Sequence, residues 1–225
     1  MTYKVVIPAR ANSKRLPGKN MKFLGNKPLI QYSIDYALSY FNSNEIWVNS
    51  DDKKILKFAE KKGIRTLLRP GYLADDFTST SDVLKFQIKY FMDQEIDCDA
   101  IVLLQPTNPF RENDLLKESI KKFQECNRNS LATFSVSEKK LGKIENNFFK
   151  PSNYKFGMRS QDLQKSYFEN GLLYITKTDS ILLGKIITDD VYPLICNTLD
   201  SKVDIDYLED FLFAESVLKL KNEKK

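Results

Sequence analysis

Hydrophobic and polar positions alternate in blocks along the first 130 residues. Short apolar, often β-branched runs at 3–8, 45–49, 64–68 and 100–105 are typical of strands. Between them, apolar residues at helical spacing predict helices over 28–40, 53–62, 78–92 and 112–125. Strands that alternate with helices and short loops indicate a parallel sheet covered on both faces, so the predicted fold class is α/β.

The pattern changes after about residue 130. Strand character returns at 131–136, 171–176 and 186–195, and an amphipathic helix is predicted over 204–220. The stretch from about 137 to 169 is polar with no clean helical period, which indicates an arm inserted in a single domain of residues 1–225. Ligands of open parallel sheets bind at the carboxyl ends of strands, so the loops after the predicted strands are the places to look for chemistry.

Composition excludes several classes of function. The chain has no histidine, which excludes histidine-based catalytic triads and HExxH zinc sites. The 35 basic and 30 acidic residues leave a net charge of +5, and no basic stripe with stacking aromatics points to nucleic acid. Three irregularly spaced cysteines (Cys98, Cys126, Cys196) predict free thiols. With neither a leader nor a membrane-spanning run in the sequence, we expect no membrane partner and a cytoplasmic protein.

The loop at 10–20, RANSKRLPGKN, follows the first predicted strand. Its cations, small polar side chains and backbone N–H groups can hold phosphate oxygens at the carboxyl end of a strand. The loop matches neither the Walker pattern nor GxGxxG. Taken alone, it can also be interpreted as a solvated basic loop.

Two further segments carry candidate chemistry. Gln105 follows the strand at 100–105, where its amide can donate and accept hydrogen bonds, although the Pro and Asn after it also suit a plain turn. Asp204 and Asp206 are separated by one residue. In an extended segment their carboxylates point the same way and can share a hard cation. Capping of the following helix is the alternative for this pair.

These blocks, in this order, resemble the CMP-sialic acid synthetase (acylneuraminate cytidylyltransferase) family. The matching motifs are RANSKRLPGKN, NSDD at 49–52, LRP at 68–70, the Asp/Ser/Thr cluster at 75–82, LLQPTNPF at 103–110, ENGLLYI at 169–175 and DIDYLEDF at 204–211. The resemblance spans nearly the whole chain. It implies a Rossmann-like three-layer nucleotidyltransferase fold with a mainly parallel sheet, and an arm over 137–169 that builds a homodimer.

The resemblance also implies a reaction and its partners. CMP is transferred from CTP to the anomeric hydroxyl of an acidic nine-carbon 2-keto sugar of sialic, legionaminic or pseudaminic type, and pyrophosphate is released. Asp204 and Asp206 are implied to hold Mg²⁺, with Mn²⁺ as a second possibility because both ions favour oxygen ligands.

Site roles follow from the matched motifs. The implied nucleotide-binding residues are Arg10, Asn12, Ser13, Lys14, Lys19, Asn20, Arg69, Thr78 and Thr80. The implied sugar-binding residues are Gln105, Arg159, Gln161, Tyr167 and Asn170, with Arg159 donated across the dimer. The implied catalytic residues are Asp206, Arg10, Lys19 and Arg159, and Asp206 is the candidate for assisting deprotonation of the sugar hydroxyl.

Two departures from the family pattern concern the sugar. Ser160 follows Arg159 where the family commonly has a second Arg, and the usual His-Pro after the block at 135–138 is missing. Three alternatives stay open: a cytidylyltransferase for the eight-carbon acid Kdo, a metal-dependent glycosyltransferase, because Asp204-Ile-Asp206 also fits the DxD pattern, and a non-catalytic anion-binding or assembly protein. Divalent-metal-dependent release of pyrophosphate from CTP would separate the first from the other two.

Overall fold

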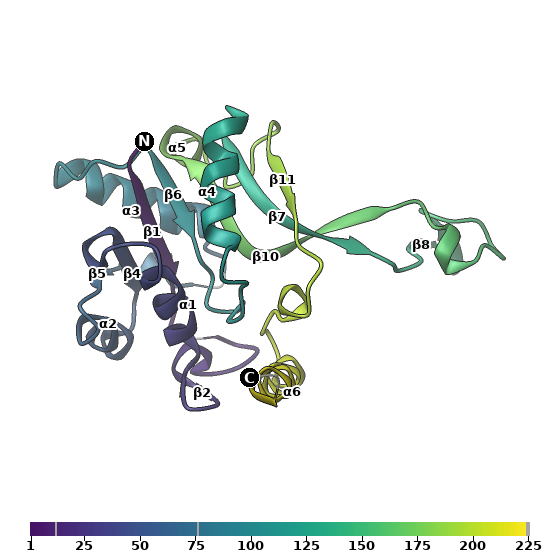
Figure 1. Cartoon of the computed structure of the whole chain (residues 1–225), viewed down its shortest axis with the longest axis horizontal. Helices are drawn as coiled ribbons and strands as arrows, with labels where there is room; N and C mark the ends of the chain where they lie inside the picture. The colour runs from purple at the N-terminus through teal and green to yellow at the C-terminus, as the bar shows by residue number, and fades with distance from the viewer. Residues whose placement is uncertain (12, 76, 224–225) are drawn as a thin grey trace.

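A twisted central sheet organises the molecule (Figure 1). The structure is a computed structural model and describes residues 1–11, 13–75 and 77–223. Over these residues the sheet has seven strands in the order β11-β7-β10-β6-β1-β4-β5. The strands are β1 (Tyr3–Pro8), β4 (Ile46–Ser50), β5 (Arg65–Leu68), β6 (Ala100–Leu103), β7 (Ser130–Ser137), β10 (Ser166–Lys177) and β11 (Tyr192–Ile195). Only β10 runs antiparallel to its neighbours within this sheet, which confirms the mainly parallel arrangement.

Helices cover both faces of the sheet. On one face lie α1 (Leu29–Leu38), α2 (Lys53–Glu60) and α4 (Leu115–Cys126), and on the other lie α3 (Thr80–Asp93) and α5 (Thr178–Leu182). The side chains of β1 point alternately to the two faces of the sheet, which explains why the core forms one apolar cluster on each face. Val5 and Ile7 pack in the first cluster with α1, α2 and α4, whereas Val6 packs in the second with α3 and α5. The expected three-layer α/β fold is confirmed.

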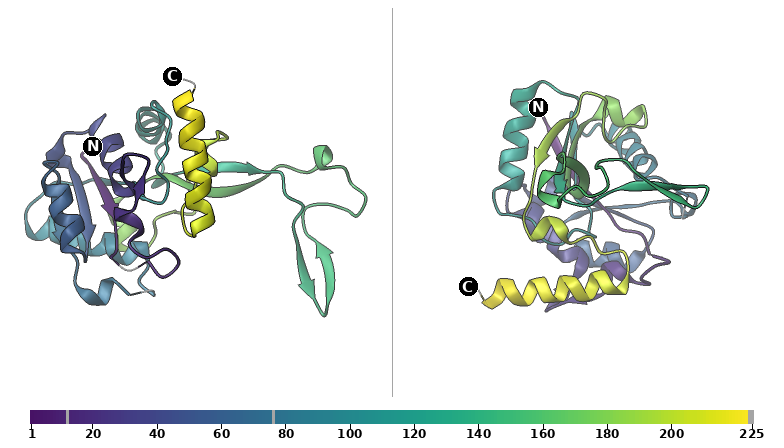
Figure 2. Two further views of the ribbon diagram at one scale, coloured as in Figure 1. Left: turned by 90° about the horizontal axis from the view of Figure 1, so that it is seen from below. Right: turned by 90° about the vertical axis from the view of Figure 1, so that its right-hand side faces the viewer.

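The C-terminal helix α6 (Leu208–Glu223) lies beside these layers (Figure 2). Phe211, Ala214 and Val217 pack in a third apolar cluster with Leu24 and Leu29. Leu24 belongs to a two-stranded hairpin of β2 (Phe23–Leu24) and β3 (Lys27–Pro28), which follows the basic loop. The C-terminal segment is thereby fixed against the loop after β1.

An arm projects away from the helical layers at the far ends of β7 and β10 (Figures 1 and 2). It carries the hairpin β8 (Gly142–Glu145) and β9 (Phe148–Pro151) and a short 3₁₀ turn, η4 (Ser160–Asp162). Its large apolar side chains are exposed, among them Ile144 (77%), Phe148 (73%) and Phe156 (71%). The other 3₁₀ turns are η1 (Lys19–Met21), η2 (Ser43–Glu45), η3 (Gly71–Leu73) and η5 (Asp200–Lys202).

Three of the predicted boundaries differ from the structure by four or more residues. The predicted strand at 186–195 is a strand only over Tyr192–Ile195, because Ile186 and Ile187 pack into the α3 and α5 layer instead of the sheet. The last helix begins at Leu208, not at 204. Strand β10 begins five residues before the predicted 171, and α5 was not predicted. Within the described residues, no helix is both long and apolar enough to cross a membrane.

Candidate active site

A pocket of about 520 Å³ opens where β1 and β6 end. From β1 the chain continues to β4 and β5 on one side of the sheet and to β6 on the other, so the strand order reverses here. Such a switch point is where open α/β sheets bind ligands. Of the expected site residues, the pocket is lined by Arg10, Ser13, Lys14, Lys19, Asn20, Arg69, Thr78, Thr80, Gln105 and Asp206. Asn12 lies outside the described residues.

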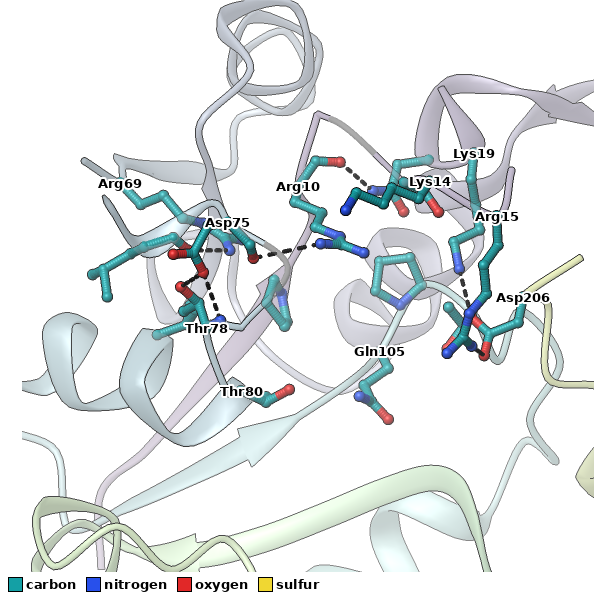
Figure 3. A pocket seen from close by; sticks show the side chains of 17 residues that line it. Arg10, Lys14, Arg15, Lys19, Arg69, Asp75, Thr78, Thr80, Gln105 and Asp206 are labelled. Carbon is teal, nitrogen blue, oxygen red and sulfur yellow. Dashed lines mark hydrogen bonds and ion pairs between the residues drawn. The ribbon is translucent and has the colours of Figure 1, made fainter. Parts of the chain in front are cut away.

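The basic loop is closed on itself by its own hydrogen bonds. The amide of Asn20 donates to the carbonyl oxygen of Arg10 (2.9 Å), so the two ends of the loop meet. The Arg10 guanidinium reaches across the pocket to the carbonyl oxygen of Asp75 (3.5 Å). Folded in this way, the loop directs the cations of Arg10, Lys14 and Lys19 to one cavity (Figure 3). Several cations around one hollow favour a polyanionic ligand such as a triphosphate.

Arg69 places a fixed positive charge on the opposite wall. Its guanidinium donates to the carbonyl oxygens of Asn49 (2.9 Å) and Leu73 (3.3 Å), and its Nε has no partner among the described residues. Burial lowers the pKa of Arg69 to about 10, so the group still carries its charge at neutral pH. These two hydrogen bonds to backbone oxygens leave the side chain little freedom.

The hydroxyl groups of this wall are ordered by a turn before α3. Asp75 Oδ1 accepts from the Thr78 backbone N–H (2.7 Å) and from the Thr78 hydroxyl (2.6 Å). Ser79 caps α3, because Ser79 Oγ accepts from the N–H of Asp82 (3.2 Å). Thr78 and Thr80 therefore flank the cap, and both line the pocket.

The two expected metal ligands differ in position. Asp206 lines the pocket, where its carboxylate accepts from Lys19 Nζ (3.0 Å) and from Arg15 Nη1 (2.5 Å). Asp204 is not among the lining residues. Its pKa is raised above the usual value, first by desolvation and also by the negative charge of Asp206, while a hydrogen bond from Thr107 acts in the opposite direction.

A divalent cation fits this site only with help from the substrate. Over the described residues, no group of three or more His, Cys, Asp or Glu side chains could hold a metal ion. Two carboxylates plus phosphate oxygens are nevertheless a donor set that Mg²⁺ commonly takes in nucleotide-binding proteins. The donor chemistry of Asp204 and Asp206 therefore fits Mg²⁺ bound together with a nucleotide.

A second hollow of about 170 Å³ adjoins the pocket. The two share Thr80 and Gln105, so Gln105 lies between them. The rest of the second hollow is lined by Leu103, Glu169, Tyr174, Ile186 and Ile187. Burial and the neighbouring carboxylate of Glu169 raise the pKa of Tyr174 to about 12, so its hydroxyl stays protonated.

Comparison with known proteins identifies the family. Residues 4–224 match the family described as Cytidylyltransferase. The chain belongs to the cytidylyltransferase family. It is 31% identical over 233 residues to a CMP-N,N'-diacetyllegionaminic acid synthase of Legionella pneumophila subsp. pneumophila, with 97% of each chain covered. It is 33% identical over 227 residues to a pseudaminic acid cytidylyltransferase of Campylobacter jejuni subsp. jejuni serotype O:2, again with 97% of each covered.

A solved structure supports the fold of this cytidylyltransferase. A CMP:2-keto-3-deoxy-manno-octonic acid synthetase complexed with CTP superposes with a TM-score of 0.72 at 15% identity. The superposition covers 98% of this chain and 100% of that one. At this identity the similarity shows the fold alone, and it confirms the Rossmann-like nucleotidyltransferase architecture.

Four of the expected sugar-binding residues of the cytidylyltransferase line neither hollow. The side chain of Asn170 is buried, donates to Ser135 Oγ (3.0 Å) and accepts from the N–H of Leu172 (3.2 Å), which holds β10 in place. Tyr167 is half exposed near the root of the arm. The remaining two, Arg159 and Gln161, lie on the arm, and Arg159 pairs there with Asp162 (2.8 Å).

Two residues of the second hollow were missed in the sequence. Glu169 and Tyr174 belong to the ENGLLYI motif, but the resemblance implied Tyr167 and Asn170 as the sugar-binding residues of this region. Strand alternation is the signal that could have separated them. The register of β10 against β7 shifts between Glu169 and Tyr174, however, so alternation does not carry through the motif.

Proposed function

We propose that this cytidylyltransferase transfers CMP from CTP to the anomeric hydroxyl of an acidic nine-carbon 2-keto sugar and releases pyrophosphate. One observation carries the proposal: a cation-lined pocket at the switch point joins a smaller hollow through Gln105. The names of the legionaminic and pseudaminic acid relatives, each similar over nearly full length, support a sugar of the sialic, legionaminic or pseudaminic type.

In this proposal the larger pocket holds the nucleotide. Arg10, Lys14 and Lys19 hold phosphate oxygens, and Arg69 adds a charge that needs no reorganisation. Asn12, Ser13, Asn20, Thr78 and Thr80 complete the nucleotide-binding set. The proposed reaction needs no covalent bond between substrate and protein. Catalysis therefore rests on positioning of the substrates and neutralisation of the phosphate charge.

Asp204 and Asp206 would hold Mg²⁺, or Mn²⁺, together with phosphate oxygens. When bound, the ion supplies further neutralisation of the phosphate charge. Because the chain has no histidine, the Asp206 carboxylate is the candidate for accepting the proton of the attacking sugar hydroxyl.

The sugar would extend from Gln105 into the second hollow, and a second copy of the chain would complete its site. Arg159 and Gln161 lie on an arm that projects away from their own sheet (Figure 2), so we infer that they serve the pocket of a partner in a homodimer. Exposed apolar side chains on the arm, such as Ile144 and Phe148, support an interface there. Tyr167 and Asn170 would position the root of this arm and β10.

We infer a cytoplasmic location from the thiols. Cys98, Cys126 and Cys196 are free. Burial raises the pKa of Cys98 and Cys196 to about 11, so these two groups stay as unreactive thiols at neutral pH. Free thiols support a reducing compartment.

Pyrophosphate release tests the proposal. Purified protein is given CTP, Mg²⁺ and a panel of acidic keto-sugars, with a control that lacks sugar. Release with a nine-carbon acid is expected. Release with Kdo alone would support the reaction but contradict the proposed nine-carbon sugar. If no sugar gives pyrophosphate and the protein does not bind CTP, the whole proposal is wrong.

The role of Asp206 has its own test. Asp206→Asn is expected to lower turnover by at least about a hundredfold, because it removes the proposed base and a metal ligand. Asp189→Asn is the matched control, since Asp189 is exposed, pairs with Lys185 (2.7 Å) and does not line the pocket. Near-normal turnover in Asp206→Asn would contradict both roles.

A further inference from the structure

The carboxylate of Asp206 is held by a cation at each oxygen. Lys19 Nζ lies 3.0 Å from Oδ1, and Arg15 Nη1 lies 2.5 Å from Oδ2 (Figure 3). Asp206 is also the carboxylate that the proposed reaction needs for a divalent cation. Such an ion would meet two positive charges at the oxygen atoms it must bind.

The two cations differ in how firmly they are held. The Lys19 side chain is buried (8% exposed), and its Nζ also donates to the carbonyl oxygen of Ile205 (2.7 Å). The Arg15 side chain is 54% exposed, and besides Asp206 its guanidinium lies over the ring of Tyr207 at 5.3 Å. Arg15 is therefore the partner that can leave Asp206 at low cost, since exposed ion pairs contribute little free energy.

The backbone around Asp206 is held by hydrogen bonds that do not involve Arg15. Asp210 Oδ2 accepts from the N–H groups of Asp206 (2.9 Å) and Tyr207 (2.8 Å). The N–H of Ile205 donates to the carbonyl oxygen of Thr107 (2.9 Å), and the Ile205 side chain is fully buried. Access to Asp206 Oδ2 thus depends on the side chain of Arg15 and not on the backbone of the segment.

The pocket offers Arg15 another partner. Arg15 lines it together with Arg10 and Lys14, so a triphosphate bound there would lie within reach of all three. Phosphate oxygens form strong charge-assisted hydrogen bonds with guanidinium groups. A bound triphosphate would compete with Asp206 for Arg15, and it would bring the oxygen atoms that complete the ligand set of the ion.

We propose that Arg15 is a positioning residue that keeps Asp206 closed to divalent cations until the triphosphate of the nucleotide draws Arg15 away. This inference rests on the proposed function. The ion and the nucleotide then load together, and the protein without nucleotide does not bind a divalent cation tightly at Asp206.

Arg15→Gln tests this with two ligands measured separately. Binding of Mn²⁺ alone, followed by the electron paramagnetic resonance signal of the free ion, is expected to tighten about fivefold, because one competing ion pair and one repulsive charge are removed. Binding of CTP alone in EDTA, followed by calorimetry, is expected to weaken about tenfold, because a charge-assisted bond is lost. A purely structural role of Arg15 would not move the two affinities in opposite directions.

Arg65→Gln is the matched control. Arg65 also lies over an aromatic ring, that of Trp47 at 5.6 Å, and is exposed outside the pocket, so this variant removes the same charge without touching Asp206. Both affinities should stay within about twofold of the wild type. Arg15→Lys keeps the positive charge but replaces the longer, planar guanidinium group by an ammonium group. It is expected to tighten Mn²⁺ binding by only about twofold.

The outcomes separate this inference from the proposed function. Equal Mn²⁺ affinity in wild type, Arg15→Gln and Arg15→Lys would overturn the role of Arg15. The Mn²⁺ measurement needs neither CTP nor sugar, so it reports on Arg15 even if the wild type fails to release pyrophosphate with any sugar. That failure would count against the proposed function alone.

Discussion

Lys19 joins two distant segments through one buried ammonium group. It comes from the loop after β1 and binds the carbonyl oxygen of Ile205 (2.7 Å) and the carboxylate of Asp206 (3.0 Å), before α6. Lys19→Met is expected to lower the free energy of unfolding by about 2–3 kcal/mol, since it leaves a buried acceptor without its donor. It should also weaken CTP binding.

The matched control for this prediction is Lys27→Met. Lys27 pairs with Asp35 (2.6 Å) outside the pocket and is more exposed than Lys19. The loss expected there is below about 1 kcal/mol, with CTP affinity unchanged. Urea unfolding and calorimetric titration measure both quantities, and equal losses of stability in the two variants would contradict the special position of Lys19.

Asp204 should show a conflict between stability and activity. Its raised pKa means that the ionised form is disfavoured in the folded state, by desolvation and by Asp206. Asp204→Asn is therefore expected to raise Tm at neutral pH by about 1–3 °C while lowering turnover. The gain should shrink as pH falls through the raised pKa, because the wild-type carboxyl group is then protonated. A gain that is constant from neutral to acid pH would contradict this explanation.

At the residue scale, sequence reasoning succeeds where a site is contiguous. The convergence of the basic-loop cations on one pocket can be predicted because they follow one strand within eleven positions. The pairing of Arg15 with Asp206 was not predicted, since 191 positions separate them and only tertiary packing brings them together. The inward orientation of Asn170 depends on Ser135 in a neighbouring strand, which a motif does not encode.

At the scale of elements, the backbone conformation of strand β10 depends on Gly171. Its φ of +76° lies in the left-handed region, and a Cβ there would lie 2.7 Å from Asn108 Oδ1. Asn108 in turn donates to the carbonyl oxygens of Asn170 (3.0 Å) and Val203 (3.1 Å), which links β10 to the segment before α6. Gly171→Ala is expected to cost about 2–4 kcal/mol, from backbone strain plus displacement of Asn108.

Gly63→Ala separates these two contributions. Gly63 has a similar φ of +74°, but nothing lies within 4 Å of an added Cβ. It should cost about 1 kcal/mol from backbone strain alone. Chemical unfolding of both variants gives the difference, and equal costs would show that the contact with Asn108 is not important.

Elements were predicted well where one periodicity dominates and poorly where packing overrides it. The helix α2 was predicted with its cap, and Asp52 does accept from the N–H of Lys54 (2.7 Å). The apolar residues Ile186 and Ile187 suggested a strand, yet they cover α3 and α5 from an irregular segment. Apolar pattern alone does not tell which layer a residue enters.

At the scale of the whole molecule, the pocket and the arm have to come from different copies if Arg159 is to meet the sugar. Arg159 pairs with Asp162 on the exposed arm and does not line either hollow of its own chain. The proposed homodimer therefore predicts composite sites. Light scattering after size exclusion should give about twice the chain mass of 26.1 kDa.

Mixed dimers provide the decisive form of this prediction. Arg159→Ala and Asp206→Asn are each expected to be inactive as pure homodimers, because every site then lacks one group. When the two are unfolded together and refolded, half of the dimers pair one of each, and in these dimers one site carries both defects while the other carries neither. Pyrophosphate release should therefore recover to about a quarter of the wild-type value.

The control is a mixture of the two variants that were folded separately. Assayed before subunits can exchange, it should stay inactive. No recovery after refolding together would show that Arg159 serves the pocket of its own chain, or none.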